Sequence, residues 1–249
     1  MEFATTSHVG LVRKVNQDVV RVDRDQSGAS AVILADGMGG HVAGEVASSL
    51  AVKTVWECLS ETSDSDFERR LLEAVQSANA IIFEESTSHA DYAGMGTTIV
   101  AVLADLERLV IAHVGDSRAY MLRRSGEFTQ LTCDHTYVNE LVRRGQLAPE
   151  AAVHHPQRHV LLRSLGTVPE VVVESKEWSW SEGDLLLVCS DGLTDVVPDD
   201  EIKRLLGAVA ALAERVEGLL AAALSAGGRD NITIAAIAHD GTLKGGFDA

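Results

Sequence analysis

Five aspartates stand at the ends of short apolar runs, where their carboxylates could bind cations. Asp36, Asp116 and Asp191 directly follow such a run, whereas Asp18 and Asp230 stand just before one. In antiparallel strands the end of one strand lies beside the start of the next, so all five aspartates can meet at one edge. Carboxylates gathered at low dielectric repel one another unless cations bind between them. Ligation by oxygen alone selects hard ions such as Mg²⁺ or Mn²⁺.

Each aspartate taken alone also has a simpler interpretation, because Asp-Gly after a strand is a common turn. Gly37, Gly39 and Gly40 follow Asp36 and leave the backbone able to approach an ion or a phosphate closely. A Gly-rich turn that opens a helix also presents free N–H groups to an anion, although such turns are common. Position alone therefore leaves two hypotheses open, a set of structural turns and a site for divalent cations.

The apolar runs beside these aspartates are typical of strands that are covered on both faces. They are short, rich in β-branched residues and bounded by Gly, Asp or Asn. They cover residues 31–35, 98–104, 109–114, 185–189 and 232–238, with shorter candidates at 19–22 and 171–173. Turn signals at 104–107 and 124–127 separate neighbouring runs and predict hairpins.

Three other segments repeat apolar residues at steps of three and four, which predicts helices over 42–58, 67–83 and 208–226. Hairpins with helices in pairs between them indicate a layered α+β domain rather than a doubly wound parallel sheet. We find no repeat of fixed period and expect a single domain over residues 1–249. Residues 132–166 are polar and rich in His and Arg, which favours a functional flap over a plain surface connection.

Composition narrows the classes of partner. The 249 residues carry a net charge of −16, which disfavours nucleic acid and anionic lipid as partners. Cys58, Cys133 and Cys189 have no metal-binding spacing, so we expect free thiols in a reducing compartment. No signal peptide or membrane-length apolar run is visible. We expect a monomeric, cytoplasmic protein that binds neither membrane nor nucleic acid.

Eight motifs follow one another along nearly the whole chain. They are RKVNQD at 13–18, ADGMGGH at 35–41, GTT at 96–98, AHVGDSR at 112–118, LTCDHT at 131–136, HPQRHVLLRSLG at 155–166, CSDGLTD at 189–195 and GGRDNIT at 227–233. Together they resemble the motifs of the metal-dependent PPM/PP2C protein serine/threonine phosphatases in their compact bacterial form. The resemblance implies a four-layer α-β-β-α sandwich, with two antiparallel sheets flanked by helix pairs and a binuclear Mn²⁺ or Mg²⁺ centre at one end.

The same resemblance implies ligands for the two ions. Asp36 matches the carboxylate that bridges both metals, and Gly37 matches the residue whose backbone carbonyl binds one of them. Asp191 and Asp230 match the ligands of the other metal.

Three more residues match supporting positions around the metals. Asp18 matches a carboxylate that holds metal-bound water, and Asn231 is expected to support the cluster from behind the ligands. Asp116 matches the aspartate that, together with Asp191, holds a third and weaker metal in bacterial members.

Two further residues match catalytic positions. Arg13 matches the family's phosphate-binding arginine, whose planar fork suits two phosphate oxygens. His41 matches the proposed general acid that protonates the departing Ser or Thr oxygen. Without the resemblance, these residues would be interpreted as a surface charge and a helix cap. Gln17 stands where many members carry Glu, which removes no expected ligand.

The function implied by the resemblance is hydrolysis of phosphoserine and phosphothreonine on proteins, by attack of a hydroxide that bridges two metals. Phosphorylated proteins and a cognate Ser/Thr kinase are the implied partners. Two alternatives stay open: a catalytically silent scaffold that binds phosphoproteins, and a hydrolase of small phosphate esters. The presence of the expected residue at every metal position argues against the scaffold.

Overall fold

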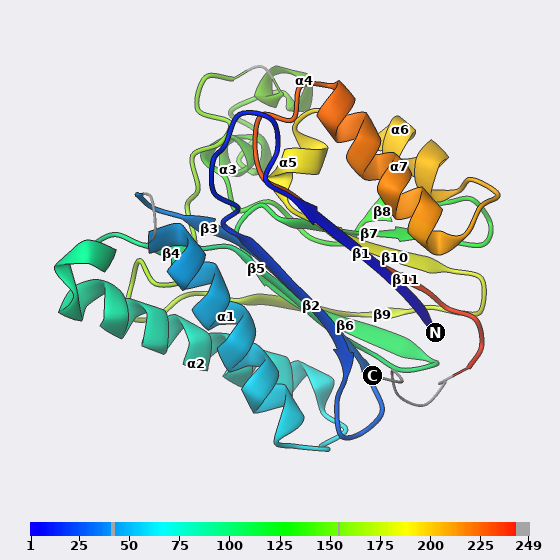
Figure 1. Ribbon diagram of the computed structural model, residues 1–249, viewed down its shortest axis with the longest axis horizontal. Helices are drawn as coiled ribbons and strands as arrows, with labels where there is room; N and C mark the ends of the chain where they lie inside the picture. Colours follow the sequence, from blue (N-terminus) through cyan, green and yellow to red (C-terminus); the bar gives the residue numbers. More distant parts are fainter. Residues whose placement is uncertain (41–42, 154, 243–249) are drawn as a thin grey trace.

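Two antiparallel sheets pack face to face in the computed structural model, which describes residues 1–40, 43–153 and 155–242 (Figure 1). The first sheet consists, in spatial order, of β1 (Glu2–His8), β11 (Ile232–Ala238), β10 (Leu185–Cys189), β7 (Arg118–Leu122) and β8 (Phe128–Gln130). The second consists of β2 (Asp18–Arg24), β3 (Ser30–Met38), β5 (Ile99–Ala104), β6 (Arg108–Val114) and β9 (Glu174–Ser179), with β4 (Gly96–Thr97) beside β3.

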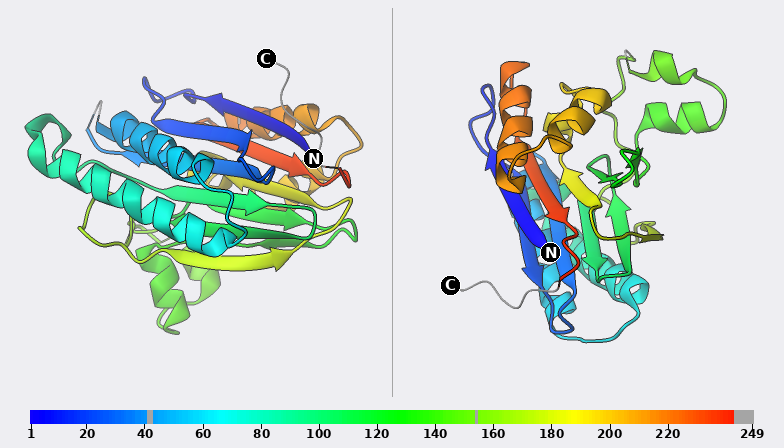
Figure 2. Two further views of the ribbon diagram at one scale, coloured as in Figure 1. Left: turned by 90° about the horizontal axis from the view of Figure 1, so that it is seen from below. Right: turned by 90° about the vertical axis from the view of Figure 1, so that its right-hand side faces the viewer.

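Helices cover the outer face of each sheet. The second sheet is covered by α1 (Ala43–Ser60) and α2 (Phe67–Ser88), which the short helix η1 (Ala90–Tyr92) follows. The first sheet is covered by α5 (Asp191–Thr194), α6 (Asp199–Leu206) and α7 (Leu212–Ser225). Figure 2 shows the sheets between these two helical layers. The expected α+β sandwich with layers α-β-β-α is confirmed.

Strands that bury both faces explain the continuous apolar runs. In β3, Val32 and Leu34 face the other sheet, whereas Ala31, Ile33 and Ala35 face α1 and α2. The same alternation occurs in β5, β10 and β11, which lie in the interior of their sheets. Neither face of such a strand meets water, so no charged residue interrupts the run.

Most of the expected elements are present. Strand β7 was missed although it is buried and lies inside its sheet, and further differences occur at sheet edges. The strand expected at 171–173 is wrong, because strand β9 begins only at Glu174 and has the polar sequence ESKEWS. This strand lies at an edge of its sheet and is largely exposed, so its sequence lacks an apolar run. Edge strands β1 and β8 were missed for the same reason. The helix expected from 208 begins at Leu212, and α6 before it was missed.

The expected flap lies between β8 and β9. It contains α3 (Tyr137–Arg143) and α4 (Pro149–Ala152) and projects from one end of the sandwich, as both views in Figure 2 show. Two isolated bridges, Thr97 to Leu165 and Thr136 to Leu161, fasten its ends. No helix among the described residues is long and apolar enough to cross a membrane.

Candidate metal centre

A pocket of about 900 Å³ opens at the end of the sandwich that carries the flap. Most residues proposed from the sequence as site residues line it: Arg13, Asp36, Gly37, Asp116, Asp191, Asp230 and Asn231. Asp18 lies directly behind, opposite Asp36 in the register of β2 and β3. The structure thus brings these eight residues together. His41 lies outside the described residues.

Antiparallel pairing explains why aspartates from opposite strand ends meet. Asp18 opens β2 beside Asp36 near the end of β3. Asp191 follows β10, and Asp230 precedes β11, the strand that pairs with β10. Asp116 lies in the turn between β6 and β7, and β7 lies on the other side of β10. That turn crosses from one sheet to the other, so both sheets contribute carboxylates to one pocket.

Two threonines of the GTT motif hold the backbone of Asp36. The Thr98 N–H and the Thr97 hydroxyl donate to the Asp36 carbonyl oxygen, at 2.9 and 2.8 Å. The Asp36 N–H donates to Thr98 Oγ1 at 3.0 Å. These bonds satisfy the backbone groups of Asp36 and fix its position, and Asp36 lines the pocket. The motif was visible in the sequence, but its positioning role was missed because the partners are about sixty residues apart.

Two glycines bring the ligand-bearing turns close together. A Cβ at Gly37 would lie 2.0 Å from the carbonyl oxygen of Gly44 in α1, so only glycine allows the helix to start against β3. A Cβ at Gly192 would lie 1.9 Å from the carbonyl oxygen of Asn231. This second contact joins the turns that carry Asp191 and Asp230.

The side chain of Asn231 fixes the loop that carries Arg13. Its Oδ1 accepts the N–H of Gln17 at 2.8 Å, and its Nδ2 donates to the carbonyl oxygens of Val9 and Val15 at 2.9 and 3.0 Å. All the hydrogen-bonding groups of this amide are thereby used within the protein. Asn231 thereby joins the loop of Arg13 to the turn that carries Asp230.

Burial makes the carboxylates at the centre of the cluster hard to ionise. It raises the pKa of the Asp36 carboxyl well above its usual range, and the negative charge of Asp18 adds to the rise. Burial likewise raises the pKa of Asp191 well above its usual range, with Asp116 as the largest neighbouring charge. The largest causes of both rises are burial and the negative charge of neighbouring carboxylates.

Burial also raises the pKa of the two flanking carboxyls, Asp18 and Asp116. Burial raises the pKa of Asp18 to about 6, although the Ser190 hydroxyl donates to Asp18 Oδ2 at 2.7 Å and opposes the rise. Burial raises the pKa of Asp116 to about 7, and the negative charge of Asp134 contributes. At the mouth of the pocket, the Arg13 guanidinium lies 2.8 Å from Asp230 Oδ2.

Divalent cations fit this arrangement of donors. Asp18 Oδ1 and Asp191 Oδ1 are buried and have no hydrogen-bond partner within the described part of the chain. An unsatisfied buried carboxylate oxygen is costly, and a hard cation satisfies several such oxygens at once. The sequence also left other pocket residues without a role, among them Arg158, His159 and Asp195. Only the polar composition of the flap pointed to the first two.

The sequence matches the family described as Protein phosphatase 2C over residues 7–226. The chain is 40% identical over 248 residues to the serine/threonine phosphatase stp of Listeria monocytogenes serotype 4b, and the match spans 98% of this chain and 97% of that protein. Similarity on this scale covers every residue of the pocket.

Solved structures are similar over the same range. A serine/threonine phosphatase of S. agalactiae has a TM-score of 0.90 and 38% identity, with 95% of this chain and 98% of that chain covered. The catalytic domain of the serine/threonine protein phosphatase PstP in complex with two manganese ions has a TM-score of 0.84 and 38% identity, with 94% and 96% covered.

Proposed function

The chain belongs to the protein phosphatase 2C family and is a serine/threonine phosphatase by that membership, and we propose that it removes phosphate from phosphoserine and phosphothreonine on proteins with two divalent ions held in the aspartate pocket. The observation that carries this proposal is the set of buried carboxylates, two of which have an oxygen without a hydrogen-bond partner in the described part of the chain. A structure similar to this chain contains two manganese ions, which supports the same stoichiometry.

The arrangement of the pocket supports the proposed ligands. Asp36 lies centrally and would bridge two ions, with the Gly37 carbonyl beside it. Asp191 and Asp230 stand on the adjoining turns of the other sheet and would complete the set. When bound, the ions supply a hydroxide at neutral pH and stabilise charge on the phosphoryl oxygens as Lewis acids. Asp18, behind Asp36, would hold water bound to the ions.

Other residues of the chain would handle the substrate. Arg13 is about half exposed at the pocket mouth and has one donor engaged with Asp230, so its remaining N–H groups can bind phosphate oxygens. His41 is proposed to give a proton to the departing Ser or Thr oxygen. The flap forms one wall of the pocket through Arg158 and His159, where the substrate protein would dock.

The physiological setting is proposed from the same activity. A phosphatase of this class acts on phosphoproteins and opposes a Ser/Thr kinase. Phosphorylated proteins and a cognate Ser/Thr kinase are therefore the partners that we propose for this chain. We propose a cytoplasmic monomer with Mn²⁺ or Mg²⁺ at two positions, and an optional third ion at Asp116 and Asp191.

A panel of phosphopeptides tests the proposal. The full chain would be assayed on phosphoserine, phosphothreonine and phosphotyrosine peptides with Mn²⁺, with Mg²⁺ and with EDTA, beside Asp36→Asn. Asp23→Asn is the matched control, because this aspartate lies on β2 and pairs with Arg21 at the surface. We expect turnover of the first two peptides with either ion and none with EDTA. Activity in Asp36→Asn would contradict the metal mechanism, and inactivity on all peptides with Mn²⁺ would favour the scaffold.

A further inference from the structure

A second pocket, of about 520 Å³, shares no lining residue with the aspartate pocket. It opens between α6, the first turn of α7 and the turn that joins β7 to β8. These elements lie on the right of Figure 1, whereas the flap helices lie at its top. Five of the lining side chains are cationic and one, Asp200, is acidic; the cations are Arg123, Arg124, Lys203, Arg204 and Arg215. This basic pocket is unusual in a chain with a net charge of −16.

Two cations of the basic pocket are available to a ligand. The side chains of Arg124 and Lys203 are exposed and form no hydrogen bond or ion pair within the part of the chain that the structure describes. The stem of Arg124 lies along the backbone of Gly183, where an added Cβ would lie 2.8 Å from the arginine Cδ. This contact positions the guanidinium without using its N–H groups.

Two further cations are paired with acids. Arg123 Nη1 lies 2.8 Å from Asp184 Oδ2, and Arg204 Nη2 lies 2.6 Å from Glu201 Oε1. The buried Asp184 also accepts the Arg124 N–H at 2.8 Å, so one carboxylate fixes the turn that carries both arginines. A guanidinium has five N–H donors, and a single acid leaves several of them for another acceptor.

Arg215 reduces a repulsion that the end of α6 would otherwise exert on an anion. The last carbonyl groups of a helix carry partial negative charge. Arg215 Nη1 donates to the carbonyl oxygen of Leu206, the last residue of α6, at 3.2 Å, and its Nε donates to that of Ala210 at 2.8 Å. The helix end therefore faces the pocket with its carbonyl charge offset by a guanidinium.

Helix stability explains only part of this cluster. Lys203 and Arg204 lie in the last turn of α6, where cations are favourable in any protein. Arg123 and Arg124 come from the turn after β7 and have no such reason to be there. Cations from two separate segments thus converge on one pocket, which indicates an anionic ligand.

The floor of the basic pocket is apolar. Leu122 and Leu185 line it beneath the cations and are almost wholly buried. Gly207 keeps this floor accessible, because an added Cβ there would lie 3.5 Å from Leu122 Cδ2. An apolar floor below exposed cations suits a segment of peptide, whose carbon atoms cover the leucines while its oxyanions reach the rim.

We propose that the basic pocket docks a phosphorylated segment of the substrate protein, at a phosphate other than the one that is removed. The inference rests on the proposed function, since it takes phosphoproteins as the substrates. A chain with a net charge of −16 repels phosphoproteins, and local positive charge offsets this repulsion where the partner approaches. Arginine forks bind two phosphate oxygens at once, and lysine adds a point charge. A second attachment raises the local concentration of substrate at the aspartate pocket.

Kinetics on a protein that carries several phosphates test the proposal. Phosphorylated casein and the small ester p-nitrophenyl phosphate would both be assayed with Mn²⁺. Wild type would be compared with the double variant Arg124→Gln, Lys203→Gln. The matched control is Lys53→Gln, Lys176→Gln, which removes two exposed cations from α1 and β9 on the other half of the sandwich.

We expect the double variant to raise KM for phosphorylated casein by about 10-fold with kcat unchanged, because two charge-assisted contacts to phosphate are lost. Added salt should raise the wild-type KM toward that of the variant. Turnover of p-nitrophenyl phosphate should be the same in all three proteins, which also shows that the variants fold. The control should keep the wild-type KM for both substrates.

Binding to the metal-free chain separates docking from turnover. Fluorescence anisotropy of labelled casein in EDTA should show tighter binding to wild type than to the double variant, and weaker binding of dephosphorylated casein, which keeps its carboxylates. Equal KM values for phosphorylated casein in wild type and the double variant, or an equal rise in the control, overturn this inference alone. Equal binding of the two forms of casein also overturns it. Inactivity of wild type on both substrates contradicts the proposed function instead.

Discussion

Strand β2 has a buried aspartate at each end, and the two carboxylates have opposite electrostatic surroundings. Asp25, just beyond the last residue, is fully buried with Arg70, whose Nη2 lies 2.6 Å from its Oδ2. Its Oδ1 accepts the Ser27 hydroxyl at 2.6 Å and the Ala29 N–H at 2.9 Å. Asp18, the first residue of β2, faces other carboxylates, and its Oδ1 has no hydrogen-bond partner among residues 1–40, 43–153 and 155–242.

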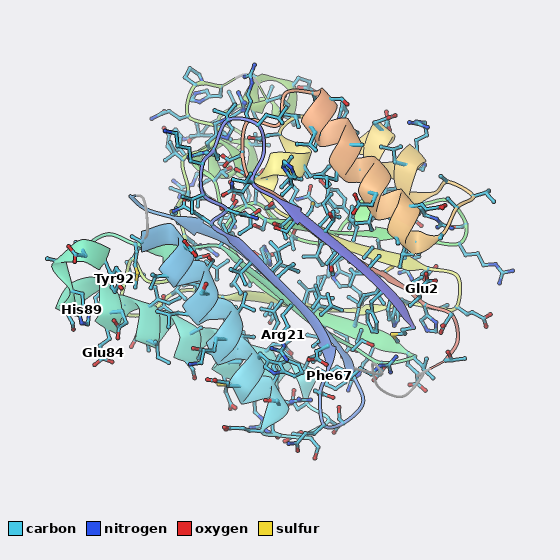
Figure 3. The ribbon with its side chains drawn as sticks, in the orientation of Figure 1. Glu2, Arg21, Phe67, Glu84, His89 and Tyr92 are labelled. Atoms are coloured by element: carbon cyan, nitrogen blue, oxygen red, sulfur yellow. The ribbon has the colours of Figure 1, made fainter. Side chains whose placement is uncertain are left out.

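The difference separates a structural carboxylate from a functional one. At the Asp25 end the chain supplies the opposite charge, and the Phe67 ring closes over Arg70 at 5.8 Å from its guanidinium carbon. Figure 3 labels Phe67 at the end of the molecule away from the flap. At the Asp18 end the described residues place no such cation at the centre of the cluster, where we propose that an ion from solution binds. A buried acid without an internal partner is therefore the sign of a binding site.

The largest expected effect is on catalysis by Asp36→Asn. Removing the central carboxylate should lower kcat/KM on a phosphothreonine peptide by at least about 10³-fold, because Lewis-acid stabilisation by bound ions contributes several kcal/mol. The metal-free variant should be no less stable than wild type, since a carboxylate that repels its neighbours is gone. Urea unfolding in EDTA measures this second effect. A clear loss of stability would mean that Asp36 is structural, like Asp25.

The next effect is on stability at the other end of β2. Asp25→Asn leaves the Arg70 guanidinium buried without its anion and should cost about 3 kcal/mol of unfolding free energy. The cost should be equal with EDTA and with Mn²⁺, because no ion binds there. Turnover by the fraction that stays folded should match wild type. If Mn²⁺ restored the unfolding free energy lost in Asp25→Asn, the Asp25 end of β2 would no longer differ from the Asp18 end.

Arg13, which pairs with Asp230 of the pocket, differs in exposure from Arg70, which pairs with Asp25. It is about half exposed, whereas Arg70 is almost wholly buried. Arg13→Ala should lower kcat/KM by about 30-fold, the equivalent of about 2 kcal/mol for a charge-assisted hydrogen bond to phosphate. Its stability should change by less than about 0.5 kcal/mol. Lys14→Ala is the control and should leave the kinetics intact; an equal loss there would indicate general surface charge.

A smaller effect is a dependence of metal-free stability on pH. Burial raises the pKa of Asp18 to about 6 and of Asp116 to about 7, from an unfolded value near 3.8. Between these values the native state holds more protons than the unfolded state. Unfolding free energy should then fall as pH rises, by about 1.4 kcal/mol per pH unit for each extra proton.

Urea unfolding in EDTA between about pH 5 and pH 7.5 measures that slope. Asp116→Asn should show a shallower fall than wild type, because one of the shifted groups is gone. Saturating Mn²⁺ should also reduce the fall, since the ions replace the protons. An equal slope in the variant would place the effect elsewhere in the chain.

The sequence predicted most interior strands of this fold but missed β7, which is buried between β10 and β8. The runs of β3 and β11 are apolar because both faces are buried, and this is visible locally. Edge strand β9 has a polar sequence and was misplaced. The aspartates of the pocket were visible from their positions at strand ends. The hold of Thr98 on Asp36 and the approach of His159 to Asp195 were not, because each joins residues far apart in the chain.

The central claim is that the pocket acids hold protons until divalent ions replace them. Calorimetric titration of the metal-free chain with Mn²⁺ at neutral pH, in two buffers of different ionisation enthalpy, counts the protons released. We expect wild type and Asp25→Asn to release protons as Mn²⁺ binds, and Asp36→Asn to bind fewer ions and release fewer protons. Mn²⁺ binding without proton release, or equal binding by Asp36→Asn, would contradict the account.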